Sequence, residues 1–309
     1  MYILKQIPED FVVDEILDIS PGQKGGYAYY HLKKKGMTTP QAITRAARLF
    51  HVPVRVINYC GLKDKDAVTT QYISVREGVG KNKEGKDISL HYLGRGKDRL
   101  AVGMLSGNRF RITVRNLDTA PKPIDRMLNL FGEQRFGHGG MNAEIGFMLI
   151  KNKFSEAARA LAVRHHDVAD ALEENPTNAI GAIRSLSKRI QLLYIHAAQS
   201  ALWNQAAVHP AAPEMLPLIG FETELSPAEE TVYTPILEKE SLRPEDFVIR
   251  QLQGLSACGD QRKVRVELRD LEISFLQEDD LNRGKKKCVV GFSLPKGSYA
   301  TVAIIQMCC

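Results

Sequence analysis

The chain has 309 residues, of which 44% are hydrophobic and 25% are charged, and its formal net charge is +6. This length allows one large domain or two ordinary domains with buried cores, and the composition is typical of soluble globular proteins. No run of apolar residues is long enough to span a bilayer, and the first five residues lack the features of a signal peptide, so a cytoplasmic location is expected.

From Phe11 to Asn116, short apolar strands alternate with charged or glycine-containing turns, which indicates an α/β region. One helix is expected to begin at Thr39-Pro40, because Thr can cap a helix and Pro fits its first turn. Strands are expected at 54–59 and 70–75, where β-branched and aromatic residues are frequent. The loop 78–87 contains three glycines and three lysines and is expected to be mobile.

The turn between these two strands places one carboxylate, Asp64, between Lys63 and Lys65. Neighbouring cations favour the ionised form of a carboxylate, and an ionised Asp64 would be available as a nucleophile. The sequence Lys-Asp-Lys-Asp is also typical of a solvated loop with weak, exposed ion pairs. The spacing alone favours this second interpretation.

Helical spacing continues from Ile124 to about Gln205, and the proline-rich stretch 209–244 is expected to be an irregular accessory region. Strands are expected again at 264–271, 288–294 and 299–305. Strands near both ends with helices between them suggest one domain interrupted by an insertion, because terminal strands often complete a single sheet.

Basic residues gather in several groups, and tyrosines are interleaved with some of them. The groups are Lys33–Lys35, the lysines of 81–86, the basic residues of 95–99 and of 109–115, and Lys285–Lys287. Such interleaving is expected where a protein binds bases and phosphates. Lysines at ordinary strand edges, which prevent sheet-to-sheet aggregation, give the same pattern, and the two interpretations are evenly balanced.

The sequence predicts no metal site. The five cysteines have no CxxC spacing, so reduced thiols are expected. His165, His166 and Asp167 are adjacent on an expected helix, where neighbouring side chains point about 100° apart and seldom share one ion.

Five separated segments resemble the TruD family of tRNA pseudouridine synthases, in the order that the family has them. They are KQIPEDFVV at 5–13, GLKDKDAVT at 61–69, SGNRF at 106–110, NLFGEQRFG at 129–137 followed by GGMN at 139–142, and LPKGSYAT at 294–301. Together they span most of the chain. Any one of them could arise by chance, but five in order are specific.

The resemblance implies an α/β (α+β) pseudouridine synthase fold, with a mixed, largely antiparallel sheet, flanking helices and an inserted TRUD-type domain. The catalytic domain is expected at 1–152 and 262–309 and the insertion at 153–261. The implied reaction converts a uridine of tRNA, expected at position 13, into pseudouridine without a cofactor or metal. The expected partner is tRNA, and neither a membrane nor an obligate protein partner is expected.

The same resemblance assigns roles to individual residues. Asp64 is implied to be the catalytic aspartate, acting on the ribose as a nucleophile or as a base, and Lys5 its basic partner. Phe131 would stack on the flipped uracil, where most other pseudouridine synthases use Tyr. The expected substrate-binding residues are Phe11, Lys63, Asn129, Phe131 and Tyr299. Lys63 could instead support Asp64, and Arg135 is expected to hold the loop that carries Asn129 and Phe131.

Other functions remain open on the sequence alone. The main alternative is a catalytically silent RNA-binding or RNA-folding module with the same groove. A zinc-dependent deaminase would need His/Cys ligand spacing that the chain lacks. A metal-dependent nuclease would need clustered carboxylates, and Asp64 and Asp66 alone are weak support for such a cluster.

Overall fold

The computed structural model describes residues 2–252 and 254–308, so Cys309 lies outside the described residues. The chain divides into two compact units, Met1–Met127 with Glu267–Cys309, and Leu128–Val266. The expected insertion, 153–261, falls inside the second unit, which begins earlier. The reason is that helix α3 (Met141–Ile150) packs against helix α7 (Lys188–Ala207) and so belongs with the later helices.

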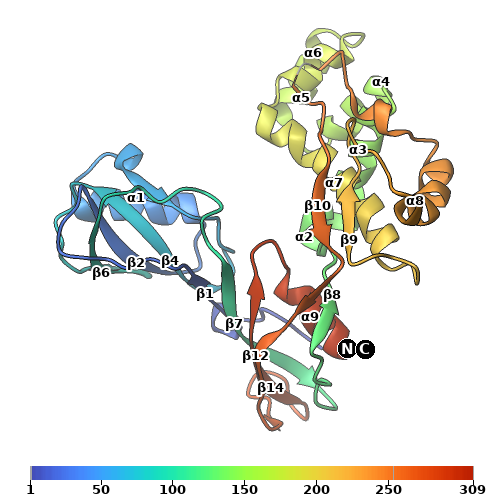
Figure 1. Ribbon diagram of the computed structural model, residues 1–309. Helices are drawn as coiled ribbons and strands as arrows, with labels where there is room; N and C mark the ends of the chain where they lie inside the picture. Colours follow the sequence, from blue (N-terminus) through green and yellow to red (C-terminus); the bar gives the residue numbers. More distant parts are fainter. Residues whose placement is uncertain (1, 253, 309) are drawn as a thin grey trace. The chain divides into compact units, whose positions relative to one another are not determined.

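The first unit is built on a ten-stranded sheet, most of which Figure 1 labels. Its main path runs β12-β14-β7-β1-β4-β2-β6-β5, while β13 pairs with β14 and β3 with β4. The strands are β1 (Phe11–Ile16), β2 (Tyr27–Lys35), β3 (Ile57–Tyr59), β4 (Val68–Arg76), β5 (Lys83–Gly85), β6 (Ile88–Gly96), β7 (Gly107–Leu117), β12 (Arg269–Ile273), β13 (Gln277–Glu278) and β14 (Lys286–Pro295). Among the described strand pairs of this sheet, β1 and β4 are parallel and the others antiparallel. The predicted mixed, largely antiparallel sheet is confirmed.

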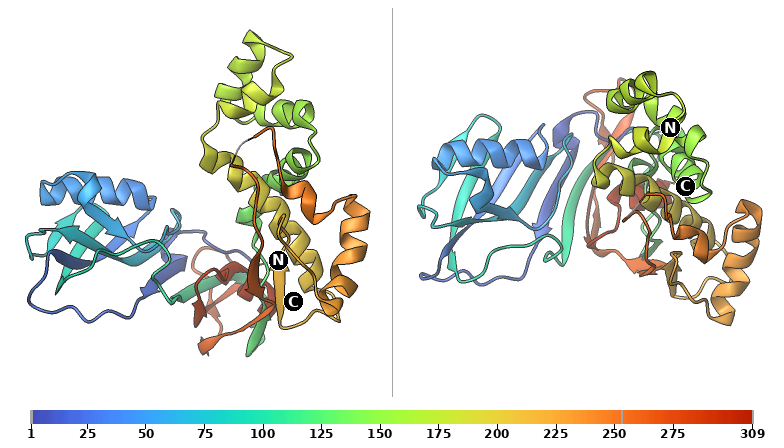
Figure 2. Two further views of the ribbon diagram at one scale, coloured as in Figure 1. Left: turned by 45° about the horizontal axis from the view of Figure 1, so that its top comes forward. Right: turned by 90° about the horizontal axis from the view of Figure 1, so that it is seen from above.

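Helix α1 (Thr39–Phe50) covers one face of the part of this sheet formed by β2, β4 and β6, as the views in Figure 2 show. The Thr38 side chain accepts a hydrogen bond from the backbone N–H of Gln41 and so caps the helix, and Pro40 lies in its first turn. Ile43 and Phe50 are buried against strand residues of β2, β4 and β6. The predicted helix is therefore confirmed, but its cap is Thr38, and Thr39 is its first helical residue.

The C-terminal strand predicted at 299–305 is wrong, because residues 300–305 belong to helix α9 (Ala300–Cys308). The run is rich in β-branched residues, which gives it a strand-like composition. Its buried residues include Ala300, Ala303, Ile304 and Met307, whose spacing is that of a helix face. The preceding strand, β14, already pairs with β7 and β12, and Gly297 then turns the chain with a φ of 82°.

Three other local predictions need correction. The strand predicted at 54–59 is shorter, because a 3-10 turn (Val54–Val56) precedes β3, and the loop predicted at 78–87 contains the edge strand β5. The stretch 209–244 is more regular than expected and contains strand β9 (Met215–Leu218) and helix α8 (Pro227–Glu240). Helix α8 begins with a capping box between Ser226 and Glu229, and it tolerates Pro235 in its interior.

The second unit is mainly helical, with α7 at its centre. Helices α3 and α8 and strand β9 contact α7, and Trp203 of α7 is fully buried. Its other elements are α2 (Glu133–Phe136), a 3-10 turn (His138–Gly140), α4 (Phe154–Ala162), α5 (His166–Glu174), α6 (Ala179–Arg184), a 3-10 turn (Pro244–Phe247) and β10 (Asp260–Lys263), which pairs with β9. The chain passes from one unit to the other within the short strands β8 (Arg126–Leu128) and β11 (Arg265–Glu267).

The four described cysteines, Cys60, Cys258, Cys288 and Cys308, are free thiols, as predicted. Burial raises the pKa of the Cys60 thiol to about 12. Within residues 2–252 and 254–308, no three His, Cys, Asp or Glu side chains are grouped so that they could hold a metal ion. No helix in this part of the chain has the length and apolar character needed to cross a membrane.

Candidate active site

The first unit brings Lys5, Phe11 and Asp64 together. Lys5 Nζ lies 2.8 Å from Asp64 Oδ2, and the two side chains are 25% and 28% exposed. The same ammonium group lies 4.1 Å from the centroid of the Phe11 ring. Lys5 has a φ of 55°, a left-handed conformation that non-glycine residues rarely adopt. The ion pair is thus partly open to solvent, and its lysine has an unusual backbone conformation.

The segment that carries Lys5 is anchored by Arg115 of β7. The backbone groups of Ile3 and Arg115 exchange two hydrogen bonds. The guanidinium group of Arg115 is buried and binds Asp10 at 2.9 Å, just before β1, and Asp279 at 2.8 Å. The hydrogen bond to Asp10 raises the pKa of Arg115 above its ordinary value, against the effect of burial. Both sides of the segment are therefore tied to the sheet.

The backbone carbonyl of Asp64 is bound by Lys34, which belongs to the basic group Lys33–Lys35 noted in the sequence. Lys34 is 1% exposed, and its Nζ donates hydrogen bonds to the backbone oxygens of Asp64 at 2.7 Å and Met37 at 2.8 Å. Burial lowers the pKa of Lys34 to about 8. Strand alternation would have indicated this, because Tyr30, Leu32 and Lys34 lie on the same face of β2.

Lys63 also points into the protein. Its Nζ lies 2.8 Å from Glu15 Oε1 and donates to Asn108 Oδ1 at 2.6 Å. The Lys63 and Glu15 side chains are 6% and 0% exposed. Glu15 Oε2 accepts from the backbone N–H of Tyr72 at 2.9 Å. Lys63 was expected to bind the substrate. Its ammonium group is instead bound by residues inside the first unit.

Glu15 was not singled out from the sequence. Its position carries a usable signal, because Phe11, Val13 and Glu15 are the inward-facing residues of β1. A carboxylate at an inward position is normally paired. Asn108 lies in one of the segments that resemble the family, but the sequence does not indicate its role. The structure shows that it accepts a hydrogen bond from Lys63.

Phe131 belongs to the second unit and is buried, with 9% of the residue exposed. The ring meets Trp203 edge-on, with centroids 5.7 Å apart and planes at 88°. Its backbone is fixed by Asn204, which accepts from the Phe131 N–H and donates to the Phe131 carbonyl, each at 2.9 Å. The guanidinium carbon of Arg135 lies 5.5 Å from the ring centroid, and Arg135 Nε donates to Ser200 at 3.0 Å.

Arg262 of β10 links Asn129 to Phe131. It donates to the Asn129 backbone oxygen at 2.7 Å and to Asn129 Oδ1 at 2.9 Å. Its guanidinium carbon lies 4.0 Å from the Phe131 ring centroid, which is cation–π geometry. Sequence reasoning missed Arg262, because it lies in a short charged strand, Asp-Gln-Arg-Lys, that looks like a solvated edge.

Tyr299 lies in the first unit, directly before α9, and is partly buried. Its carbonyl accepts hydrogen bonds from Val302 and Ala303 in the first turn of that helix. The predicted site residues therefore fall into two sets. Lys5, Phe11, Lys63, Asp64 and Tyr299 belong to the first unit, and Asn129 and Phe131 to the second.

The family model of tRNA pseudouridine synthase D (TruD) matches residues 2–170 and 207–306 of this chain. The chain belongs to the TruD family. The tRNA pseudouridine synthase D of Methylococcus capsulatus is 29% identical to it over 349 residues, which cover 97% of this chain and 89% of that protein. The tRNA pseudouridine synthase D of Syntrophotalea carbinolica is 27% identical over 388 residues, covering 98% and 95%.

The fold agrees with this membership. The solved structure assigned to TruD of Methanosarcina mazei matches with a TM-score of 0.78 and 25% identity, covering 99% of this chain and 93% of that one. The predicted family and α/β fold class are confirmed. The predicted enzyme class is confirmed as well, because TruD proteins are pseudouridine synthases and hence isomerases.

Proposed function

We propose that this TruD-family chain converts a uridine of tRNA, at position 13, into pseudouridine and that Asp64 is its catalytic group. The observation that carries the proposal is the ion pair of 2.8 Å between Lys5 and Asp64. It joins two of the segments that resemble the family, and it presents a carboxylate that is partly open to solvent. We expect the enzyme to act in the cytoplasm on tRNA.

The reaction rearranges one nucleotide without adding or removing atoms. The bond between uracil N1 and ribose C1′ breaks, the uracil turns, and a bond forms between C5 and C1′ while the proton leaves C5 and one is gained at N1. An ionised Asp64 would serve as a nucleophile at the ribose or as a base that removes a ribose proton. Lys5 would orient the carboxylate in either case.

A base inside folded RNA must leave its stack before this chemistry, and the flipped base needs an aromatic surface and polar edge contacts. We assign the stacking surface to Phe131 and the edge contact to Asn129, both in the second unit, and further substrate contacts to Phe11 and Tyr299, which belong to the first unit. The contact of Arg262 with both Asn129 and Phe131 supports a single rigid recognition element.

Lys63 is better explained as an anchor of the catalytic turn than as a substrate ligand. Its ammonium group is engaged by Glu15 and Asn108. Its backbone N–H also donates to Thr39 Oγ1 at 2.9 Å. Lys63 is adjacent to Asp64, so these contacts fix the backbone that carries the proposed catalytic carboxylate.

The test is to incubate the protein with unmodified tRNA and to map pseudouridine by sequencing. The wild type should form one pseudouridine, at position 13, and Asp64→Asn should form none while its affinity for tRNA is unchanged. Asp66→Asn is the matched control, because Asp66 is exposed on the same turn, and it should retain wild-type activity. A wild type that binds tRNA but forms no pseudouridine would instead support the silent RNA-binding module.

A further inference from the structure

Lys34 is a buried charged residue with no role in the reaction described above. Its side chain is among the largest that the first unit buries completely. Removing an ammonium group from water is expensive unless hydrogen bonds and nearby opposite charge compensate for it. Both conditions are met, because Lys34 Nζ donates to two backbone oxygens and the carboxylate of Asp64 attracts its charge.

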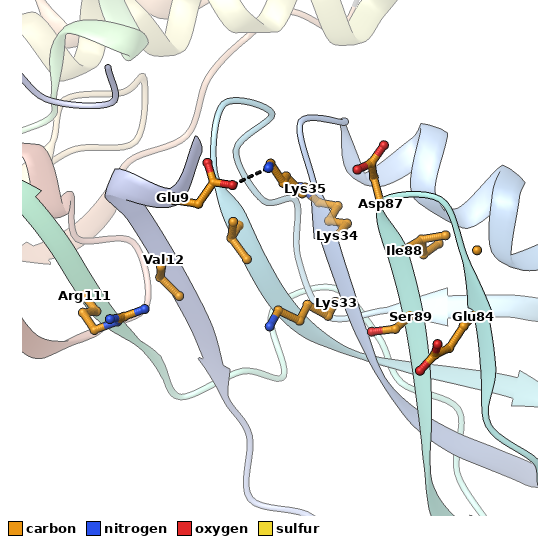
Figure 3. Close-up of a pocket in the computed structure, with 12 residues that line it drawn as sticks. Glu9, Val12, Lys33, Lys34, Lys35, Glu84, Asp87, Ile88, Ser89 and Arg111 are labelled. Carbon is orange, nitrogen blue, oxygen red and sulfur yellow. Dashed lines mark hydrogen bonds and ion pairs between the residues drawn. The ribbon is translucent and has the colours of Figure 1, made fainter. Parts of the chain in front are cut away.

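The neighbours of Lys34 on β2 behave differently. Lys33 and Lys35 are exposed and point away from the face that buries Lys34, and Lys35 forms an ion pair with Glu9. Figure 3 shows this pair together with Lys33 and Arg111, which line a groove with a volume of about 530 Å³. The run of three lysines therefore combines two surface cations with one interior cation.

We propose that Lys34 is a positioning residue for Asp64, which fixes the backbone of the catalytic turn while Lys5 fixes the carboxylate. The inference rests on the proposed function of Asp64. Lys5 binds Oδ2 at one end of the residue, and Lys34 binds the main-chain oxygen at the other. With both ends held, the side chain keeps one orientation toward the substrate, as a preorganised catalytic group requires.

The charge of Lys34 is sensitive to its surroundings. Burial lowers its pKa to about 8, the ionised Asp64 opposes this shift, and the charge of Lys63 adds to it. Each of these two neighbours is itself paired, Asp64 with Lys5 and Lys63 with Glu15. At neutral pH Lys34 is a cation. Above pH 8 it becomes an amine that retains N–H donors but no longer attracts the carboxylate.

The first test compares Lys34→Met with the wild type and with Lys24→Met, the same change at an exposed position of the same unit. Amide hydrogen exchange of residues 61–67, followed by mass spectrometry, should become at least about tenfold faster in Lys34→Met, because a hydrogen bond from a charged donor is lost. The kcat for pseudouridine formation should fall about 10- to 100-fold, with KM for tRNA changed less than about twofold. Lys24→Met should match the wild type in all three measurements.

The second test uses the wild type, so it does not depend on the variant folding. The backbone carbonyl ¹³C resonance of Asp64, observed by NMR, should titrate with a midpoint near pH 8. A carbonyl resonance that stays constant while the Lys34 ammonium group itself deprotonates, followed by its ¹⁵Nζ resonance in the same titration, would overturn the positioning role, and so would wild-type exchange and kcat in Lys34→Met. If no pseudouridine forms in any sample while the carbonyl titrates and the exchange rises, Lys34 still positions the turn and it is the proposed function that fails.

Discussion

Breaking the buried ion pair between Lys63 and Glu15 should destabilise the first unit and displace the catalytic turn. In Lys63→Met the carboxylate of Glu15, which is fully buried, loses its counter-charge and keeps only the hydrogen bond from Tyr72. Leaving one charge of a buried pair uncompensated costs about 3–5 kcal/mol. That is a large share of the roughly 5–15 kcal/mol by which folded domains are stable.

The assay is thermal unfolding followed by calorimetry, together with pseudouridine formation below the transition. At about 2–4 °C per kcal/mol for a unit of this size, the Tm of Lys63→Met should fall by about 6–20 °C. Lys65→Met makes the same change at an exposed position of the same turn, so its unfolding free energy should stay within about 0.5 kcal/mol of the wild type.

A double-mutant cycle separates the pair from other effects of the substitution. Glu15→Gln removes the buried charge, so the double variant Lys63→Met/Glu15→Gln should be more stable than the sum of the single losses predicts, by about 0.5–3 kcal/mol. Strict additivity, or a Lys63→Met protein as stable as Lys65→Met, would refute the argument that this pair supports the turn.

Three further outcomes are expected. Arg262→Met should fold but lose most pseudouridine formation, with KM for tRNA little changed, because Asn129 and Phe131 lose their common contact. Arg262→Lys should not restore the activity, since lysine lacks the planar fork whose Nε and Nη2 both donate to the Asn129 backbone oxygen. The pKa of Lys34 is lowered to about 8, so its cation is present below this pH and lost above it. Wild-type kcat measured from pH 6.5 to 9.5 should therefore decline above pH 8. If Lys34→Met shows the same decline, the loss of activity at high pH is caused by another group. Arg115→Met should destabilise the first unit, measured by urea unfolding, by more than any exposed Arg→Met change, because it leaves two buried carboxylates unpaired.

The turn that carries Asp64 is held by contacts from several separate strands of the sheet. The carboxylate is bound from the segment before β1, the carbonyl from β2, and the adjacent Lys63 from β1 and β7. Each contact comes from a different part of the chain, so a local change in any of these strands would be felt at the same carboxylate. This arrangement suits a group whose position decides the rate.

The sequence by itself was sufficient for the elements that local patterns specify. Strand alternation and the Thr39-Pro40 start signal predicted much of the sheet and helix α1, and five motifs predicted the family. The same motifs paired Lys5 with Asp64, and the contact is present, although its catalytic role stays a prediction. Composition failed at 299–305, because β-branched residues satisfy a helix as readily as a strand when tertiary packing buries the helical face.

Strand alternation indicates that Lys34 lies on the inner face of β2, but only the tertiary structure decided which groups the lysines near Asp64 bind. Lys33, Lys34 and Lys35 are chemically identical, yet only Lys34 is buried, because the pleat of β2 turns it toward the catalytic turn. Lys63 depends in the same way on Glu15 and Asn108, which the chain places on two other strands. The burial and pairing of a charge depend on long-range contacts, so they emerge only when the sheet is assembled.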